Sequence, residues 1–321
     1  MRLDPQDLER LPEPEAPANT DSFITLFLKM ARPWFLLGGV LLYALGVGIA
    51  RYLGTDINWQ NYLVGQAWVT LLQLAAQFLD EYYDAPEDQT NTNRTIFTGG
   101  SGALGPGKLP RRVALQAALG VLAVLASLTV VMLAQGMLSP PAVLIMALAF
   151  AGAFFYATPP VRLEETGYGE LTASILVAFL VPAYAYLLQT GDLHRLIPMV
   201  AFPLTCLHLA MLIAFHLPDY ANDLRYERQT LLVRLGWERG MGLHNLLILS
   251  AFFLLALAVT FGLPLGIAWP AFLTLPLALL QIWQMRRIAQ GATPNWTALT
   301  LNAVTLFIAA AYLLAFGFWT S

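Results

Sequence analysis

Charged residues are scarce in this sequence. Only 12% of its 321 residues are Asp, Glu, Lys or Arg, whereas a soluble domain has about 25%. Hydrophobic residues make up 58% of the chain, and the mean hydropathy is +0.62. This composition is typical of an integral membrane protein and excludes an ordinary soluble domain. We therefore expect the lipid bilayer as its surroundings, with no nucleic-acid partner and no obligatory protein partner.

Cysteine is nearly absent, and so is any sign of a cleavable leader. The one cysteine, Cys206, excludes a disulfide framework and a cysteine-based zinc site. The first 22 residues are polar, acidic and rich in proline, which excludes a signal peptide. We expect residues 1–30 to be a polar arm, disordered or interfacial, with an interfacial helix near residues 23–30. Residues 31–321 are predicted to form a single transmembrane domain.

Long apolar runs fill the rest of the chain. A membrane-spanning helix takes about 17–25 residues. Nine runs are long enough, at residues 34–52, 62–79, 113–134, 140–157, 171–189, 198–217, 243–263, 266–284 and 298–319. The fourth begins at Pro140 and Pro141, and Pro270 and Pro276 interrupt the eighth. The predicted fold class is all-α, a polytopic bundle of about nine transmembrane helices around a central cavity.

The basic residues indicate how the bundle is oriented. With nine spans, 15 of the 17 Lys and Arg residues fall on the side that holds the N-terminus. Only Arg51 and Arg195 fall on the opposite side. Because basic loops stay in the cytoplasm, the N-terminus is predicted to be cytoplasmic. The expected location is a bacterial or archaeal inner membrane, with any active site toward the cytoplasm.

The few acidic residues gather at two places. One cluster reads DEYYDAPED (residues 80–88) and the other reads DYAND (residues 219–223), each at the end of an apolar run. Carboxylates at the edge of hydrocarbon are costly unless something pairs with them. Mg²⁺ is a suitable partner, because it binds hard oxygen ligands and in turn holds phosphates. Pro86 is expected to bend or unwind the helix within the first cluster.

The spacing within the clusters supports a shared metal site. Asp80, Asp84 and Asp88 recur every four positions, and Asp219 and Asp223 repeat that spacing. Residues four apart lie on one face of a helix. Like charges placed so closely repel each other, and a bound cation would relieve the repulsion. Two such sets on the same predicted side suit two or more Mg²⁺ ions that hold a diphosphate.

Other stretches then make a family resemblance specific. FTGGSGAL (residues 97–104) follows the first cluster, YATPPVRLEETGYGEL spans residues 156–171, and HLPDYANDLRYERQTLLVRLG (residues 216–236) contains the second. Together with the two D-x-x-x-D motifs, they resemble the UbiA superfamily of intramembrane prenyltransferases. Within it, the sequence is most similar to the menaquinone-pathway branch, which prenylates 1,4-dihydroxy-2-naphthoate.

The resemblance implies a function and three kinds of site residue. The function is Mg²⁺-dependent transfer of a polyprenyl group from an allylic prenyl diphosphate to an aromatic acceptor. The catalytic metal ligands are Asp80, Asp84, Asp88, Asp219 and Asp223. Contacts to the diphosphate are expected from Arg94, Lys108, Arg225, Arg228 and Ser101. The resemblance also implies aromatic residues that shield the allylic carbocation or contact the acceptor. They are Tyr82, Tyr83, Tyr156 and Tyr220.

Several positions depart from the family pattern. Asp80 replaces the usual asparagine, Glu81 a common aspartate and His216 a frequent asparagine, and the stretch after Asp84 is one residue short. These changes leave the acceptor open between dihydroxynaphthoate, 4-hydroxybenzoate, homogentisate, a tetrapyrrole and a glyceryl phosphate lipid. Two alternatives have no enzymatic function: a membrane transporter and a protein that only binds a prenyl lipid.

Polar residues outside the two acidic motifs also have predicted roles. One of Glu164, Glu165 and Glu170 is expected to orient the acceptor or to take a proton. His208 and Gln73 are expected to be core polar residues whose hydrogen bonds are satisfied.

Overall fold

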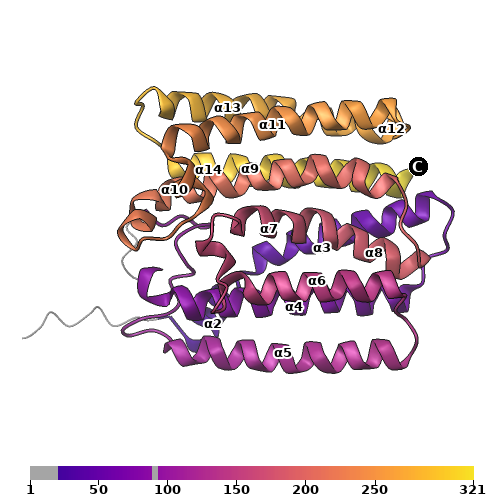
Figure 1. Cartoon of the computed structure of the whole chain (residues 1–321), viewed down its shortest axis with the longest axis horizontal. Coiled ribbons are helices and arrows are strands. Elements are labelled where there is room, and N and C mark those ends of the chain that lie inside the picture. The colour runs from indigo at the N-terminus through magenta and orange to yellow at the C-terminus, as the bar shows by residue number, and fades with distance from the viewer. Residues whose placement is uncertain (1–20, 89–92) are drawn as a thin grey trace, which may run out of the picture.

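The computed structural model describes residues 21–88 and 93–321, and for Glu87 it describes the backbone only. Most of the predicted N-terminal arm, residues 1–20, thus lies outside the described residues. Helices and short helical turns make up all the named elements (Figure 1). They are α2 (Phe23–Ala31), α3 (Pro33–Tyr52), α4 (Trp59–Asp88), α5 (Arg111–Ala134), α6 (Pro140–Ala157), η1 (Leu163–Glu165), α7 (Gly169–Ile175), η2 (Leu176–Leu180), α8 (Val181–Thr190), α9 (Leu196–Arg225), α10 (Leu231–Leu235), α11 (Trp237–Thr260), α12 (Leu265–Ala268), η3 (Trp269–Thr274), α13 (Leu275–Ala289) and α14 (Trp296–Thr320).

The long helices confirm the predicted all-α membrane bundle. Over the described part of the chain, nine helical segments are long and apolar enough to cross a membrane. They lie side by side along the long axis of the molecule (Figure 1). Two are composite: α7, η2 and α8 form one, while α12, η3 and α13 form another. Proline lies near the start of both η3 and α13, where Pro270 and Pro276 were expected to interrupt the helix.

Several helices keep most of their apolar surface on the outside of the bundle. Only 17% of the apolar window of α5 and 28% of that of α11 is buried inside the protein. Large side chains such as Leu246, Phe253 and Trp283 are exposed. A helix that is apolar all round needs an apolar solvent on its outer face. The outer surface therefore fits a bilayer.

Helices α4 and α9 carry the two acidic clusters at the same end of the bundle. Their last turns lie toward the left of Figure 1, near α2 and α10. Helix α4 packs against α3, α5 and α6, while α9 packs against α11 and α14. These contacts hold the two cluster-bearing helices within one bundle.

The sequence predicts that Pro86 bends or unwinds the helix, and the structure shows that the helix is not unwound there. Helix α4 continues through Pro86 to Asp88. A proline inside a helix leaves the carbonyl four residues earlier without its N–H donor. Here that carbonyl belongs to Tyr82, and the Arg111 side chain donates to it through Nε. An arginine at the start of α5 therefore replaces the hydrogen bond that proline removes.

The predicted short helix before the first span is present as α2. Ser22 caps it, because its side chain accepts a hydrogen bond from the backbone N–H of Thr25 at 3.2 Å. Phe23, Ile24 and Leu28 are exposed on its surface. Helix α2 ends at Ala31, and the next residue, Arg32, has a φ of 41° that turns the chain into α3.

Candidate functional site

A cavity of about 400 Å³ opens between α4 and α9 and extends into the bundle. Its polar end is lined by Arg32, Asp80, Asp84, Asp88, Glu164, His216, Asp219, Asn222, Asp223 and Arg228. Its apolar end is lined from α4, α6, α9, α14 and the composite helix by residues including Trp68, Leu72, Ile145, Leu176, Leu180, Met211, Val304 and Phe307. Between Trp68 and Asp84, α4 rises by about 24 Å. A charged mouth is thus continuous with a long apolar chamber.

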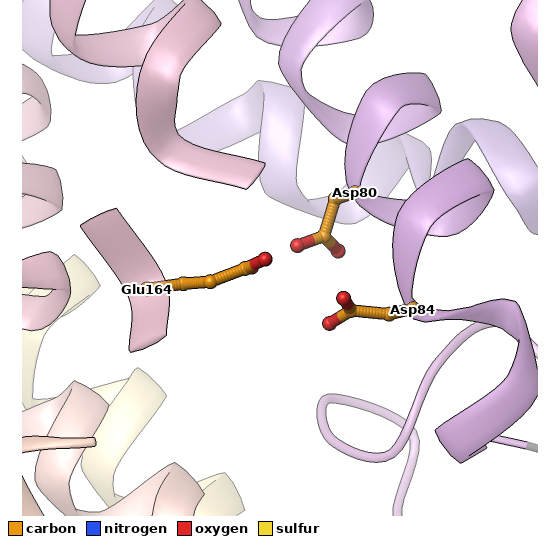
Figure 2. Close-up of side chains that lie close together, drawn as sticks. All are labelled: Asp80, Asp84 and Glu164. Atoms are coloured by element: carbon orange, nitrogen blue, oxygen red, sulfur yellow. The ribbon is translucent and has the colours of Figure 1, made fainter. Parts of the chain in front are cut away.

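Three carboxylates converge at the mouth of this cavity. Asp80 and Asp84 on α4 point toward Glu164 of η1 (Figure 2). One oxygen of each residue lies within 4.8 Å of the other two. Oxygen atoms gathered this closely can share one divalent cation. Glu164 was expected only to orient an acceptor or to take a proton, so its place in this group is a finding of the structure.

Two arginines hold the same carboxylates. Arg228 Nη2 lies 2.8 Å from Asp84 Oδ2 and 3.4 Å from Glu164 Oε2. Arg162 Nη2 lies 3.3 Å from Asp84 Oδ1 and 3.4 Å from Glu164 Oε1. Both guanidinium groups offset the repulsion between acids that are largely out of water. Arg228 also lines the cavity, where a phosphate oxygen beside the carboxylates would meet it, and arginine is well suited to phosphate.

The electrostatic setting at the mouth raises the pKa of two acids outside the spans, Glu164 and Asp88. The pKa of Glu164 is well above its ordinary value, first because burial disfavours the charge and then because Asp84 and Asp80 repel it. Arg228 and Arg162 act in the opposite direction. Burial and repulsion from Asp84 raise the pKa of Asp88 to about 8. A cation at the mouth would favour both ionised carboxylates.

The second acidic cluster lines the same cavity from α9. Asp219 and Asp223 are both in its wall, and Asn222 lies between them in the sequence. Asp223 is buried and accepts a hydrogen bond from Thr230 Oγ1 at 3.3 Å. His216 Nδ1 lies 3.6 Å from the same carboxylate. Asp223 is thus oriented by its neighbours, while both clusters face one shared space.

The glycine-rich loop after α4 closes one side of the mouth. Thr98, Gly99 and Gly100 line the cavity. Gly100 has a φ of 75°, and a Cβ there would lie 1.9 Å from Asp88 Oδ2. Glycine is therefore required both by the backbone conformation and by the close approach of the carboxylate.

Glu81 ties this loop to the start of α3, and it does not line the cavity. Its carboxylate accepts hydrogen bonds from the Ser101 backbone N–H at 2.8 Å and from Ser101 Oγ at 2.6 Å. Arg32 Nη2 also lies 2.6 Å from Glu81 Oε1. Ser101, predicted as a diphosphate contact, is therefore placed on Glu81, away from the cavity wall.

Several other residues predicted for the site lie outside the cavity wall. Arg94 is exposed, and its Nη2 donates to the backbone oxygen of Asp88 at 2.5 Å. Lys108 Nζ donates to the Gly102 carbonyl at 2.7 Å. Both stabilise the loop instead of facing the carboxylates. Arg225 points elsewhere, with its guanidinium 6.0 Å from the Tyr226 ring.

Four tyrosines were predicted to shield the allylic carbocation or to contact the acceptor. Of these four, only Tyr156 is in the cavity wall. Arg111 lies 4.2 Å from the ring of Tyr82, and the rings of Tyr82 and Tyr83 are 5.0 Å apart. Tyr220 packs against Trp237. These three rings belong to helix packing at the edge of the site.

Three phenylalanines that were not predicted as site residues give the cavity an aromatic surface. Phe97 and Phe215 are stacked with centroids 5.7 Å apart, and Phe35 meets both edge-on. All three line the cavity. They come from the glycine-rich loop, α9 and α3, so their meeting depends on the fold. The only earlier signal for Phe97 was its position within the FTGGSGAL stretch.

The bundle and its mouth define a class: a multi-pass membrane protein with a carboxylate- and arginine-lined site above an apolar chamber. The sequence profile of the UbiA prenyltransferase family matches residues 40–295. The chain belongs to this family, an assignment that confirms the resemblance drawn from its motifs.

Solved structures share the fold. A UbiA homologue from Archaeoglobus fulgidus bound to DMAPP and Mg²⁺ is 18% identical, with a TM-score of 0.65 over 90% of this chain and 98% of that one. Its complex with GPP and Mg²⁺ gives a TM-score of 0.63 at 18% identity, over 92% and 100% of the two chains. A structure of digeranylgeranylglyceryl phosphate synthase gives 0.62 at 13% identity, over 93% and 99%. A search of curated proteins found no match.

Proposed function

We propose that this protein transfers a polyprenyl group from an allylic prenyl diphosphate to an aromatic acceptor. The strongest support is the continuity of one cavity from a carboxylate-rich mouth to an apolar chamber. A prenyl diphosphate has the same division, with an anionic head and a hydrocarbon tail. The family assignment and the prenyl diphosphates bound to the Archaeoglobus fulgidus homologue support the same substrate.

The residues at the mouth fit Mg²⁺. The oxygen atoms of Asp80, Asp84 and Glu164 are close enough to share one ion. Asp88, Asp219 and Asp223 line the same space and supply further carboxylates. When bound, Mg²⁺ would neutralise the charge of the diphosphate and make it a better leaving group. Mg²⁺ also accompanies the substrate in the homologous complexes.

The chain's own residues account for the rest of the chemistry. Arg228 would bind phosphate oxygens beside the carboxylates, and Arg162 would hold Asp84 and Glu164 in position. As the allylic C–O bond breaks, its electron pair leaves with the diphosphate, and the allylic carbon becomes positive. The rings of Tyr156, Phe97 and Phe215 would stabilise that charge and keep water out. The acceptor ring then forms a C–C bond to the allylic carbon and loses a proton.

The acceptor that we propose is dihydroxynaphthoate, within menaquinone biosynthesis. Support comes from the motifs, which resemble those of the menaquinone-pathway branch. A glyceryl phosphate lipid is a second candidate, since digeranylgeranylglyceryl phosphate synthase shares the fold. A pure transporter is disfavoured, because both acidic sets line one mouth together with Arg228, which pairs with Asp84.

We also propose that this mouth faces the cytoplasm of a prokaryotic cell. Of the 17 basic residues, 15 fall on the side of the acidic clusters. The positive-inside rule favours that orientation. Cysteines introduced at Gly107 and at Asp56 test it: in intact cells, an impermeant thiol reagent is expected to label position 56 and not position 107. The reverse pattern would contradict the orientation.

An assay on the purified protein tests the function. The protein in detergent is incubated with Mg²⁺, a long-chain prenyl diphosphate and a panel of acceptors: dihydroxynaphthoate, 4-hydroxybenzoate, homogentisate and a glyceryl phosphate lipid. We expect prenylated dihydroxynaphthoate and an equal amount of released diphosphate. Neither product nor diphosphate with any acceptor would contradict the enzymatic function. Product with another acceptor would correct the acceptor alone.

A further inference from the structure

Two aromatic side chains close the apolar end of the cavity. Trp68 on α4 and Tyr184 on α8 both line it, and their ring centroids are 5.4 Å apart. Trp68 is the first residue of α4 in the cavity wall, whereas the carboxylates of Asp80 and Asp84 come near the last turns of that helix. We call Trp68 and Tyr184 the floor of the chamber, because they lie at the end opposite the mouth.

Neighbouring helices hold the floor in place. Trp68 Nε1 donates a hydrogen bond to Thr129 Oγ1 of α5 at 2.9 Å, and Thr129 Oγ1 donates to the Leu125 carbonyl at 2.8 Å. Tyr184 packs against Tyr43 of α3, with ring centroids 6.2 Å apart. A chain that moved the indole aside would break a hydrogen bond inside the membrane, which is costly. The two rings therefore form a fixed surface.

The helices beyond the floor are in close contact. Gly65 lies about one turn beyond Trp68 on α4, and a Cβ there would collide with Tyr43 Oη and Leu188 Cδ2. Gly65, Tyr43 and Leu188 are buried, and they are not among the described residues that line the cavity. Helices α3, α4 and α8 thus meet behind the two rings, and the chamber does not continue past them.

A π-helical turn shapes the wall just above the floor. Leu176, Val177 and Leu180 belong to this turn, η2, and all three line the cavity. Tyr184 follows Leu180 by about one turn of helix. Turns of this kind are rare and occur mostly at functional sites. The irregular wall beside the floor therefore favours a ligand-binding chamber over ordinary packed core.

The wall between the mouth and the floor is mostly apolar. Of the two polar residues there that were expected to be satisfied, His208 is confirmed, since its Nδ1 lies 3.0 Å from Ser174 Oγ. The expectation for Gln73 is wrong, because its buried side-chain oxygen accepts no hydrogen bond from the described residues. That oxygen lies against Gly39 of α3 and so offers nothing to a ligand. A tail in the chamber is therefore bound by apolar contact.

The distance from the carboxylates to the floor limits how much of a tail fits. Along α4, Asp80 and Trp68 are about 18 Å apart. An isoprene unit adds four chain carbons, or about 5 Å when it is extended. A tail of about three to four units therefore reaches from the mouth to the floor.

We propose that Trp68 and Tyr184 set the number of isoprene units that the chamber binds. This inference rests on the proposed prenyl transfer and specifies its donor. The donor class is an allylic diphosphate whose first three to four isoprene units, by the estimate of about 5 Å each, fill the chamber, as in farnesyl or geranylgeranyl diphosphate. The further units of a longer donor turn aside at the floor, so they add nothing to its affinity.

Binding of donors of increasing length tests the floor without any acceptor. The probes are geranyl, farnesyl, geranylgeranyl and geranylfarnesyl diphosphate, each longer than the last by one isoprene unit. The readout is their Mg²⁺-dependent affinity for the purified protein in one detergent. Comparing each variant with the wild type at equal donor length cancels the partitioning of the donor into detergent.

Two variants move the floor in opposite directions. Trp68→Ala removes the indole and deepens the chamber. Leu72→Trp raises the floor by about one isoprene unit, because Leu72 lines the cavity about 6 Å nearer to the carboxylates. Trp283→Ala is the matched control, since Trp283 is exposed and is not among the described residues that line the cavity.

In the wild type, we expect the affinity to rise about tenfold or more with each unit up to geranylgeranyl diphosphate, since each unit buries apolar surface. Geranylfarnesyl diphosphate should bind no more tightly. In Trp68→Ala, geranylfarnesyl diphosphate should gain about tenfold over geranylgeranyl diphosphate. In Leu72→Trp, the rise should end one unit earlier, at farnesyl diphosphate, while geranyl diphosphate binds as in the wild type. Trp283→Ala should match the wild type at every length.

Three results would overturn the inference. A wild-type affinity that still rises from geranylgeranyl to geranylfarnesyl diphosphate would mean that the tail leaves the bundle sideways. An unchanged limit in both chamber variants would mean that the floor does not determine length. If Trp68→Ala binds every donor weakly, Leu72→Trp decides, and a limit that stays at geranylgeranyl diphosphate refutes the assignment.

The same experiment separates this inference from the proposed function. If the wild type shows the expected length limit but prenylates no acceptor, the proposed transfer has failed and the floor remains as a property of donor binding. Transfer to an acceptor without a length limit would refute the floor alone. Absence of Mg²⁺-dependent binding for every donor would contradict both.

Discussion

Asp84 is the residue on which most interactions at the mouth converge. It belongs to the three-carboxylate group and pairs with both Arg228 and Arg162. Asp84→Asn keeps the shape of the side chain and removes its charge. We expect turnover to fall by about 100-fold or more, the scale of losing one preorganised electrostatic contact. Asp219→Asn is expected to behave alike, because Asp219 lines the same cavity.

The matched control is Asp56→Asn. Asp56 is exposed and lies between α3 and α4, at the far end of α4 from the clusters. The Asp56→Asn variant should keep the activity of the wild type. Its melting temperature should be similar to those of Asp84→Asn and Asp219→Asn. Wild-type turnover in Asp84→Asn would show that the carboxylates do not hold the metal.

Asp88 gives the site a specific dependence on pH. Burial and repulsion from Asp84 raise the pKa of Asp88 from its ordinary value of 3.8 to about 8. The folded protein therefore keeps a proton on Asp88 at pH values where the unfolded chain has already released it. Between those values the folded state holds the extra proton, so stability without added metal should fall as pH rises. Mg²⁺ must displace this proton, and its affinity should therefore increase from pH 6.5 to pH 9.

Thermal unfolding in detergent, with and without Mg²⁺, measures this dependence. The shift in melting temperature caused by Mg²⁺ should be larger at pH 9 than at pH 6.5. In Asp88→Asn, the difference between the two pH values should be smaller. The same Mg²⁺ shift at both pH values in the wild type would refute the link to Asp88.

Prediction from sequence was most successful for residues whose position depends only on helix spacing. The i, i+4 rule placed Asp80, Asp84 and Asp88 on one face, and they do line one cavity. Glu164 and Arg162 come from the connection between α6 and α7. Their approach to Asp84 depends on how helices pack, which local spacing does not determine. Arg94 and Lys108, which the family resemblance implies as diphosphate contacts, donate to backbone carbonyls in this structure.

At the scale of elements, the glycine-rich loop is fitted tightly to the end of α4. A Cβ at Gly100 would collide with the Asp88 carboxylate. We expect Gly100→Ala to weaken Mg²⁺ binding about tenfold or more, comparable to losing a contact that orients a metal ligand. A metal titration followed by thermal shift measures the change.

Gly107→Ala is the control for backbone strain. Gly107 has a similar φ of 71°, but a Cβ there would meet nothing within 4 Å. The two variants share the conformational cost, and only Gly100→Ala disturbs Asp88. Equal loss of Mg²⁺ affinity in both would mean that loop strain, and not the contact with Asp88, is responsible.

The last turn of α4 depends on Arg111. Because Arg111 donates to the Tyr82 carbonyl that Pro86 leaves free, Arg111→Met should destabilise the protein by about 1 kcal/mol. Pro86→Ala restores an N–H donor to the helix, so the double variant should recover most of that loss. Chemical unfolding of the four proteins measures the coupling. Independent, additive effects would contradict the exchange of partners.

The last turn of α4 also shows which features of the helices could not be predicted from the sequence. The apolar runs located all nine spans to within several residues at each end. The effect of Pro86 could not be predicted, because its compensation comes from an arginine on a different helix. The extension of α4 and α9 beyond their apolar runs also follows from tertiary contacts, since polar residues form the last turns of both.

At the scale of the whole molecule, one cavity connects both acidic clusters to the interior of the bundle. Composition predicted the membrane bundle, and the motifs predicted the family, which the profile match confirms. The apolar chamber was not predictable, because a lining of Leu, Val and Phe reads the same as packed core. Its walls come from segments as distant as Trp68, Leu176 and Val304.

The central claim is that the mouth holds the diphosphate while the chamber holds the prenyl tail. A prenyl diphosphate with a photoreactive group at the end of its tail tests it, with mass spectrometry to locate the crosslink. With Mg²⁺ present, we expect labelling of the chamber wall, at Val69, Leu180 or Phe307, and Asp84→Asn should abolish it. Labelling of the lipid-facing surface of α5 or α11, unaffected by Mg²⁺ or by Asp84→Asn, would contradict the account.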